Sequence, residues 1–341
     1  MKNPGKIIGA AFLLVLVFAL YAGWELFGPT LTPPIGNFFY IQTGSTYGEV
    51  RDSLVKKGII QSAFWFDRTA HMVHYEKEIR PGKYRITDGM SLLNLVRMLR
   101  SGRQVPVRLV ITKLRTKEEL AHKIGVEFEP DSADVIRYFS NNDSLAPFGV
   151  DSNTVLTLII PNTYIINWNT SLTAILKRLA RENHRFWNPK RLEEAAKLHL
   201  TPQQVYTLAS IVEEETNRVE DKGKIASVYL NRLHKGMKLA ADPTIKYAMK
   251  DFGLKRIYYK YLTVPSPYNT YLHKGLPPGP INTPSMETLD AVLNSPQTDY
   301  LYFVARPNSG GLSDFSKTFG EHQHYARAYQ NALDSLYKPG R

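Results

Sequence analysis

The sequence contains no cysteine, and several familiar catalytic motifs are also missing. Without cysteine the protein cannot form a disulfide, a thiol nucleophile, a thiolate metal site or a lipidated cysteine. HExxH, GxSxG, Walker and GxGxxG patterns are absent, which removes the commonest zinc peptidase, α/β-hydrolase and nucleotide-binding classes. His322 and His324 in EHQH would diverge on a helix, so we expect them to be solvated or packed and predict no metal site.

The sequence also lacks any run of five or more basic residues. Its formal charge is +12, from 43 basic and 31 acidic residues. Because this charge is dispersed, we predict no binding to nucleic acid and expect lipid headgroups and acidic cell-wall polymer as the anionic neighbours. With 341 residues, 43% of them hydrophobic, and no low-complexity tract, the chain is long enough for about two folded domains.

The N-terminal segment is apolar and carries no charge from Ile7 to Trp24. Its length approaches the roughly 20 residues that cross a bilayer. The segment is long for a signal peptide and no A-x-A site follows it, so we predict an uncleaved anchor rather than a cleaved secretory signal. Lys2 and Lys6 precede it, which by the positive-inside rule places the chain from about residue 28 outside the cytoplasm. The predicted segments are a cytoplasmic tail (1–6), a single transmembrane helix (7–27) and a proline- and glycine-rich linker (28–37).

Residues 38–111 alternate strand-like and helix-like segments, which predicts a small α+β module. NFFYIQTG, GKYRIT and VPVRLVIT are rich in aromatic and β-branched residues, as is typical of strands. TYGEVRDSLVKKG and MSLLNLVRMLRSG carry apolar residues at helical spacing and end at Gly58 and Gly102.

Residues 112–341 contain mostly helical patterns together with aromatic loops, which predicts a second α+β domain. Its clearest element begins at TPQQ, where Thr201 as N-cap, Pro202 at the first helical position and Gln204 form a capping box. The other elements that we expect are a strand followed by a loop in LTLIIPNTYII, a helix capped by Asp242-Pro243, short strands in the aromatic segment from Arg256, a strand at LYFVAR, and a helix from about Glu321 to Tyr337.

The helix that begins after Thr201 ends in three consecutive glutamates, in the stretch LASIVEEET. At about 100° per residue, one apolar stripe is formed by Val205, Leu208, Ile211 and Val212. Glu215 continues this stripe, Glu214 points roughly opposite and Glu213 lies near the boundary. From spacing alone, a helix that frays into a solvated acidic end is the simpler interpretation. The alternative is that Glu215 emerges into a cleft, stays protonated near neutral pH and donates to a leaving oxygen.

The segment YNTYLHKGLPPGP joins aromatic and amide side chains to a stiff loop. Tyrosine faces and amide groups suit a sugar, which offers apolar C–H faces and many hydroxyls. A structural turn with core tyrosines would have the same composition, so both interpretations stay open from the residues alone. The candidate substrate-binding residues are Tyr268, Asn269, Tyr271, Gly275, Pro277 and Pro278.

Five motifs in order carry a resemblance to a known family. They are SIVEEET, SVYLNRLHKGMKLAADPTIKYAM, YNTYLHKGLPPGPINTP, YLYFVA and the pair Glu321-His322. Together they resemble the endolytic murein transglycosylases of bacteria, the MltG or YceG-like family. The similarity is strong from about Thr201 to Tyr329 and weaker through PNTY at Pro161. The N-terminal anchor and the small α+β module lie where the family has an anchor and a LysM-like subdomain, and 112–341 corresponds to its catalytic domain, with a core at 201–329.

The resemblance implies cleavage of peptidoglycan within the glycan strand, between N-acetylmuramic acid and N-acetylglucosamine, leaving a 1,6-anhydro end. The family's catalytic glutamate is the second acidic residue of an E-x-E-T motif, which is Glu215 here. We expect Glu215 to act as general acid and then as general base, and this proton transfer requires no metal and no organic cofactor. The resemblance also implies a location in the bacterial cytoplasmic (inner) membrane, facing the periplasm, and peptidoglycan synthases as partners. Candidates to orient the substrate or Glu215 are Glu213, Asn231 and Asp242.

The chain departs from the family pattern at three places. Glu214 replaces the usual lysine between the two glutamates, and we expect this like charge to raise the proton affinity of Glu215. PNTY has Asn162 where the family tends to have aspartate, and GGLSDF lacks the usual histidine, so neither site is predicted to be catalytic. Two alternatives stay open: a two-carboxylate muramidase, which would leave hydrated reducing ends, and a peptidoglycan-binding scaffold without catalysis.

Overall fold

The computed structural model describes residues 4–254 and 256–337, and the fold is mixed α+β, as predicted. The first three residues of the predicted cytoplasmic tail lie outside the described residues. The chain forms two compact units. Unit 1 combines residues 1–108 with two short later segments, 127–130 and 165–171, and unit 2 contains 109–126, 131–164 and 172–341.

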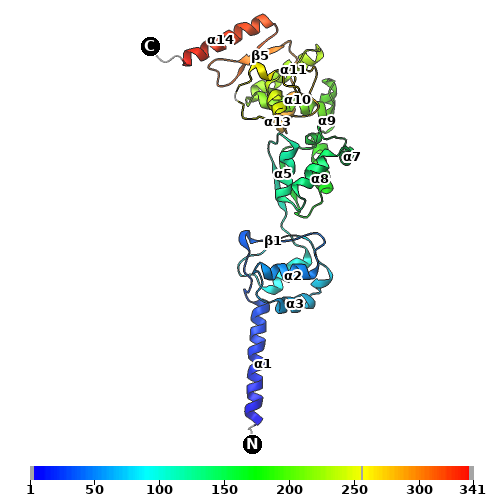
Figure 1. The fold of residues 1–341 in the computed structure, drawn as a ribbon, viewed down its shortest axis with the longest axis vertical. Coiled ribbons are helices and arrows are strands. Elements are labelled where there is room, and N and C mark those ends of the chain that lie inside the picture. The colour runs from blue at the N-terminus through cyan, green and yellow to red at the C-terminus, as the bar shows by residue number, and fades with distance from the viewer. Residues whose placement is uncertain (1–3, 255, 338–341) are drawn as a thin grey trace. The chain divides into compact units, whose positions relative to one another are not determined.

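The N-terminal helix α1, Pro4–Phe27, is one continuous helix (Figure 1), and its sequence is apolar along almost its whole length. Its 24 residues span about 36 Å, which exceeds the roughly 30 Å of a bilayer's hydrocarbon core. The side chains from Ile7 to Leu20 are exposed, and near the end of this apolar run the rings of Phe18 and Tyr21 lie 6.2 and 6.0 Å from that of Trp65. In the described part of the chain, α1 is the one helix that is long and apolar enough to cross a membrane.

Unit 1 is built on a two-stranded antiparallel sheet covered by helices. Phe39 of β1 pairs with Tyr84 of β2, and both side chains are fully buried. These two strands and the helices that end at Gly58 and Gly102 are as predicted, whereas the third predicted strand of the module, Val107–Ile111, does not join this sheet and pairs with Asn162–Ile166. Gly102 adopts the positive φ of 66° that ends α4. Helix α3 was not predicted. The elements are η1 Ile35–Asn37, β1 Phe38–Ile41, α2 Tyr47–Lys56, α3 Ala63–Met72, η2 Tyr75–Lys77, β2 Gly82–Arg85 and α4 Leu92–Ser101.

The two later segments of unit 1 are tied to each other and to the loop that follows β1. The backbone N–H of Glu129 donates to the carbonyl of Trp168 at 3.0 Å. The carboxylate of Glu129 accepts from both the backbone N–H and the hydroxyl of Thr43, each at 2.6 Å. The amide of Gln104 donates to Asn169 at 3.2 Å. Residues distant in sequence thus complete the fold of unit 1.

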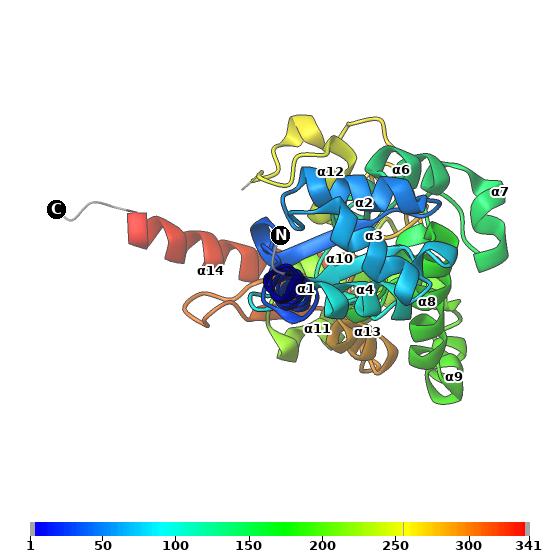
Figure 2. The same ribbon diagram turned by 90° about the horizontal axis from the view of Figure 1, so that it is seen from below.

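Unit 2 is predominantly helical, with short two-stranded sheets. Helices α11 and α13 lie side by side, and both pack against α10 (Figures 1 and 2). The helices are α5 Lys117–Glu127, α6 Ser132–Ser140, α7 Asn142–Leu145, η3 Ala146–Phe148, η4 Val155–Leu158, α8 Leu172–Phe186, α9 Pro189–Lys197, α10 Pro202–Glu215, α11 Val219–His234, α12 Asp242–Met249, η5 Tyr259–Tyr261, α13 Met286–Leu293 and α14 Phe319–Tyr337. The strands are β3 Val107–Ile111, paired with β4 Asn162–Ile166, and β5 Tyr302–Ala305, paired antiparallel with β6 Ser313–Ser316.

Helix α10 is the centre of the core of unit 2. Its predicted capping box is confirmed, because Thr201 accepts from the backbone of Gln204 and the Gln204 side chain accepts from the backbone of Thr201. Every residue from Val205 to Val212 is buried, on all sides of the helix. Helices α9, α11, α12 and α13 surround it. The predicted apolar stripe is therefore part of a helix that is enclosed all round.

Three predictions of local structure are wrong. In LTLIIPNTYII the order is reversed: η4 precedes Pro161 and strand β4 begins after it, because proline has no N–H for a strand ladder. The aromatic segment from Arg256 to Pro280 contains a 3₁₀ turn and no strand among its described residues. Asp242 is the first residue of α12 and does not cap it; the N-cap is Ala241.

Candidate active site

Glu215 is the last residue of α10, where the helix leaves the core, and it is partly exposed. Its Oε1 accepts a hydrogen bond from the hydroxyl of Tyr229 at 2.5 Å. Tyr229 is buried in α11, and its ring packs edge-on against Phe303 of β5 with centroids 5.9 Å apart. One carboxyl oxygen of Glu215 is therefore held by the protein, whereas Oε2 has no hydrogen-bond partner within the residues described.

The surroundings of Glu215 raise the pKa of its carboxyl toward neutral pH. Burial raises the pKa of its carboxyl from 4.5 to about 7, because the charged form loses hydration. The negative charge of Asp242 acts in the same direction, whereas the Tyr229 hydrogen bond and the positive charges of Arg232 and Lys246 lower this pKa. A carboxyl with a pKa near 7 can supply a proton and then, as carboxylate, take one back at neutral pH.

Asp242 and Tyr271 form a second hydrogen-bonded pair at this site. The hydroxyl of Tyr271 donates to Oδ1 of Asp242 at 2.6 Å. Burial raises the pKa of Tyr271, and the charges of Asp242 and Glu215 raise it further, so the phenol stays protonated and remains a donor. The structure thus brings two of the predicted residues, Asp242 and Tyr271, into the electrostatic environment of Glu215.

Glu213 faces a different part of unit 2. Its carboxylate accepts hydrogen bonds from the hydroxyls of Ser285 and Thr288, at the N-terminus of α13. It also pairs with the ammonium group of Lys222 at 3.4 Å, and the Lys222 side chain is only 6% exposed. These contacts join α10, α11 and α13, and a role of Glu213 in orienting the substrate or Glu215 stays a prediction.

Glu214 is neutralised by two cations from the segment before α5. Its Oε1 lies 2.7 Å from the ammonium group of Lys113 and 3.7 Å from the guanidinium group of Arg115, and it accepts from Asn282 at 3.1 Å. The largest like-charge effect on Glu215 therefore comes from Asp242 and not, as expected, from Glu214. The expectation failed because it treated the neighbour in sequence as unpaired.

Three other candidate residues direct their polar groups into the protein. Asn231 donates its amide hydrogens to the carbonyls of Thr298 and Tyr300, at 2.8 and 3.0 Å. Asn269 is fully buried and its amide donates to the carbonyls of Leu262 and Val264. Tyr268 packs against Tyr247 of α12, with centroids 4.6 Å apart. These contacts shape the loops beside the site. The orienting role of Asn231 and the substrate contacts of Tyr268 and Asn269 stay predictions.

The GLPPGP loop lies along the other half of α10. Gly275, Pro277 and Pro278 line a cavity of about 500 Å³ together with Thr201 and Thr207. About 12 Å of helix separates Thr207 from Glu215. Gly279 allows close packing, because a Cβ at this position would lie 2.2 Å from the carbonyl oxygen of Asn153. The structure does not bring Gly275, Pro277 and Pro278 to Glu215, and their role in substrate binding stays a prediction.

Sequence reasoning missed Tyr229, the residue that contacts Glu215 directly. A signal was present, because Tyr229 lies among Ile225, Val228 and Leu230 in α11, and a buried tyrosine normally has a hydrogen-bond partner for its hydroxyl. Arg232 was missed as well; its guanidinium donates to the carbonyls of Leu239 and Leu301, at 2.5 and 2.8 Å. No group of three or more histidine, aspartate or glutamate side chains that could hold a metal is found in the described residues.

The chain belongs to the YceG-like family, whose model matches residues 39–328. The family predicted from the ordered motifs is therefore confirmed. Among its relatives, the endolytic murein transglycosylase of Bacillus subtilis is 30% identical over 337 residues, and the alignment covers 91% of each chain.

Two further comparisons agree with this assignment. The endolytic murein transglycosylase of Streptococcus pneumoniae, strain D39, is 27% identical over 354 residues, which is 91% of this chain and 64% of the pneumococcal protein. The crystal structure of a YceG-like protein from Listeria monocytogenes is similar with a TM-score of 0.54 and 30% identity, covering 84% of this chain and 98% of that one.

Proposed function

We propose that this chain is an endolytic lytic transglycosylase, which cleaves peptidoglycan strands between N-acetylmuramic acid and N-acetylglucosamine. The observation that carries the proposal is a single carboxyl group, that of Glu215, with a pKa of about 7 and one oxygen held by Tyr229. The names of the Bacillus subtilis and Streptococcus pneumoniae relatives support the same activity.

In the proposed reaction, protonated Glu215 donates its proton from Oε2 to the glycosidic oxygen as the bond from that oxygen to C1 of N-acetylmuramic acid breaks. The resulting carboxylate then removes the proton of the C6 hydroxyl of the same sugar, whose oxygen forms the new bond to C1. The products are a 1,6-anhydro end and a free hydroxyl on the leaving sugar, and Glu215 regains its proton. One carboxyl suffices because the attacking hydroxyl is already tethered to the reacting sugar.

A two-carboxylate muramidase is the alternative that the site favours next. Such an enzyme needs a second carboxylate to act on water or on C1. Asp242 is close enough to Glu215 to raise its pKa, and it is exposed at the start of α12. The two reactions differ in their products, because water attack leaves a hydrated reducing end.

We also propose that α1 anchors the enzyme in the bacterial cytoplasmic membrane and that the rest of the chain faces the periplasm. Lys2 and Lys6 precede the apolar run and Glu25 follows it, which supports this orientation. Cleavage close to the membrane would end nascent strands, so peptidoglycan synthases are the expected partners. Unit 1 would serve as a LysM-like, glycan-binding module.

The proposal is tested with the full chain in detergent, incubated with un-crosslinked peptidoglycan strands and followed by mass spectrometry. We expect 1,6-anhydro ends from the wild type and from Glu220→Gln, a control at an exposed glutamate of α11, and none from Glu215→Gln. Hydrated reducing ends would make the protein a hydrolase. Strand binding without cleavage by any variant would leave a scaffold.

A further inference from the structure

Helix α3 of unit 1 lies beside the end of the N-terminal helix α1 (Figure 1). The ring of Trp65 in α3 lies 6.2 Å from that of Phe18 and 6.0 Å from that of Tyr21, both in α1. Trp65 also contacts the ring of Phe64, its neighbour in α3, edge-on at 5.2 Å. Four aromatic rings from two helices thus form one cluster, and two of them belong to the proposed membrane anchor.

The position of this cluster along α1 determines how close unit 1 comes to the bilayer. From Ile7 to Tyr21 the side chains of α1 are exposed, and this stretch rises about 21 Å. The next turn is partly covered by unit 1, at Ala22, Glu25 and Leu26. Because the hydrocarbon core is about 30 Å thick, the uncovered stretch falls about 9 Å short of crossing it, and a tilt of the helix would increase the shortfall. The covered turn, together with the part of unit 1 beside it, therefore has to reach the lipid.

The outer face of α3, formed by Phe64, Trp65, Arg68 and Met72, has the composition of a helix that lies in a membrane interface. Phe64, Arg68 and Met72 follow one another at i, i+4 and i+8, and so share one side of the helix. Phe64 is 55% exposed and Met72 is 58% exposed, although both side chains are apolar. The guanidinium group of Arg68 is exposed and lies 5.3 Å from the centre of the Phe64 ring. Apolar side chains with a long cation above them are typical of helices at the boundary between headgroups and acyl chains.

The acidic residue of α3, Asp67, is paired within unit 1. Its carboxylate accepts from the hydroxyl of Tyr47 at 2.5 Å and lies 3.6 Å from the guanidinium group of Arg51, both in α2. Asp67 therefore contributes to the contact between α2 and α3, whereas Arg68 is left on the outer face. A cation at this position is favoured beside the phosphates of anionic lipids.

We propose that the outer face of α3 rests in the lipid interface of the membrane that α1 crosses. Phe64, Trp65 and Met72 would lie among the outer ends of the acyl chains, with Arg68 at the phosphate groups. Trp65 makes this surface continuous with the anchor, because its ring packs on α1. The inference rests on the proposed anchoring by α1, and it assigns a second, peripheral membrane contact to unit 1.

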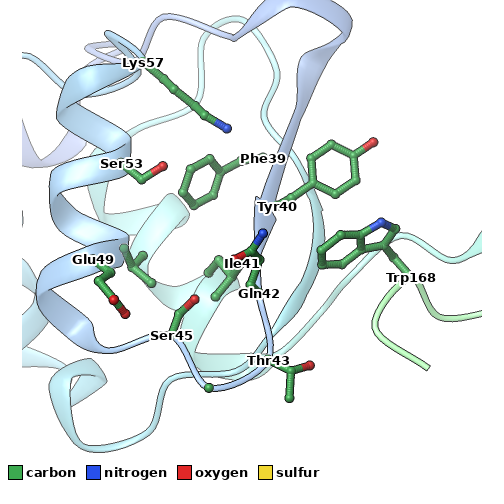
Figure 3. Close-up of a pocket in the computed structure, with 12 residues that line it drawn as sticks. Phe39, Tyr40, Ile41, Gln42, Thr43, Ser45, Glu49, Ser53, Lys57 and Trp168 are labelled. Carbon is green, nitrogen blue, oxygen red and sulfur yellow. The ribbon is translucent and has the colours of Figure 1, made fainter. Parts of the chain in front are cut away.

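The surface on α3 differs from the cavity of about 520 Å³ that unit 1 also contains. That cavity is lined from within residues 39–57, which supply β1, the loop after it and α2, and by Trp168. Figure 3 shows Tyr40 and Trp168 on one side of β1, and Ser53 and Lys57 on the other. The cavity and the outer face of α3 therefore use different residues, and side chains of β1 and α2 can serve as controls for the lipid contact.

Because the sequence has no cysteine, single labels can be placed in the full chain. Phe64→Cys and Met72→Cys, each carrying a nitroxide, are reconstituted in bilayer discs of phosphatidylethanolamine and phosphatidylglycerol. The depth of each label is measured from its collisions with oxygen and with a water-soluble nickel complex. We expect both labels about 5–10 Å below the phosphate groups. The matched controls are Tyr40→Cys and Val55→Cys, whose native side chains are 38% and 41% exposed, and their labels should report water.

A further label, Leu14→Cys in the exposed part of α1, separates this inference from the anchoring on which it rests. If the Leu14 label lies deep in the bilayer but the Phe64 and Met72 labels meet the nickel complex as freely as the controls, the lipid contact of α3 is refuted and the anchor stands. A Leu14 label in water would refute the anchor and the inference together. Spin–spin broadening at Phe64 that disappears on dilution with unlabelled chain would make α3 a contact between two copies, which also overturns the inference. If Phe64→Cys fails to fold, Met72→Cys decides.

Discussion

Removal of the Tyr229 hydroxyl should raise the pKa of Glu215 and move the pH dependence of cleavage. The hydroxyl donates to Oε1 of Glu215 at 2.5 Å and lowers the pKa of this carboxyl. A hydrogen bond to a charged group contributes about 1.5–3 kcal/mol, and about 1.4 kcal/mol corresponds to one pKa unit. In Tyr229→Phe the pKa should therefore rise by about 1–2 units above its present value of about 7.

The direction of the effect on rate follows from the role of Glu215. The acid must be protonated when the glycosidic bond breaks, so its pKa sets the basic limb of the pH profile. We expect this limb to move to higher pH in Tyr229→Phe and the acidic limb to stay in place. Burial and the nearby charge of Glu215 hold the pKa of Tyr229 well above its ordinary value, so the wild-type phenol stays protonated through the measured range.

The assay is the initial rate of anhydro-end formation between about pH 5 and 10. Tyr206→Phe is the matched control, because Tyr206 is also fully buried and its hydroxyl donates to the carbonyl of Ile159 at 2.6 Å, away from Glu215. Both variants lose one buried hydrogen bond, but only one of them should shift the limb. A basic limb that is unmoved, or that moves to lower pH, in Tyr229→Phe would refute the assignment of Glu215 as the acid held by Tyr229.

Three further substitutions have defined outcomes. Asp242→Asn removes a like charge, so the basic limb of the same pH profile should move to lower pH, opposite to Tyr229→Phe. Glu215→Gln should stabilise the protein, because the pKa of the Glu215 carboxyl is raised from 4.5 to about 7 in the folded state. The wild-type carboxyl therefore lowers the free energy of unfolding increasingly as the pH rises from 4.5 to about 7, by about 3 kcal/mol at most. Melting temperatures of variant and wild type should thus coincide near pH 4 and separate at pH 8, and a gap that is constant with pH would contradict this. Gly279→Ala should destabilise by about 1–3 kcal/mol, seen as a lower denaturant midpoint, because its Cβ would meet the Asn153 carbonyl at 2.2 Å; an unchanged midpoint would mean that the loop can move away.

The sequence predicted the structure best where the structure depends on residues that are neighbours in the chain. The capping box at Thr201, the glycine ends at Gly58 and Gly102 and the strands of unit 1 depend on neighbours in sequence, and each was predicted correctly. Helix α3 was missed, and the strand of LTLIIPNTYII was placed before Pro161, although proline cannot donate to a strand ladder and the partner strand, β3, comes much earlier in the sequence. Local propensity cannot contain that information.

The three glutamates of α10 show that sequence reasoning is also limited at the site by contacts with distant parts of the chain. Helical spacing placed Glu215 on the apolar stripe, but α10 is buried on every side from Val205 to Val212, so spacing could not show what each glutamate contacts. They differ in their partners, which come from different places in the chain: Ser285 and Thr288 for Glu213, Lys113 for Glu214, and Tyr229 for Glu215. Helical spacing and the resemblance to a family both selected Glu215, and the resemblance gave it a catalytic role.

The discontinuity of unit 1 along the chain affects how this protein can be synthesised and rearranged. Residues 1–108 leave the ribosome well before the segments 127–130 and 165–171, so the unit cannot be completed until synthesis has passed residue 171. A recombination event that moved residues 38–111 into another gene would leave Glu129 and Trp168 behind. Unit 1 therefore cannot be transferred to another protein as one continuous segment. We expect its residues to be inherited together with residues 109–126 and 131–164 of unit 2, which lie between its segments in the sequence.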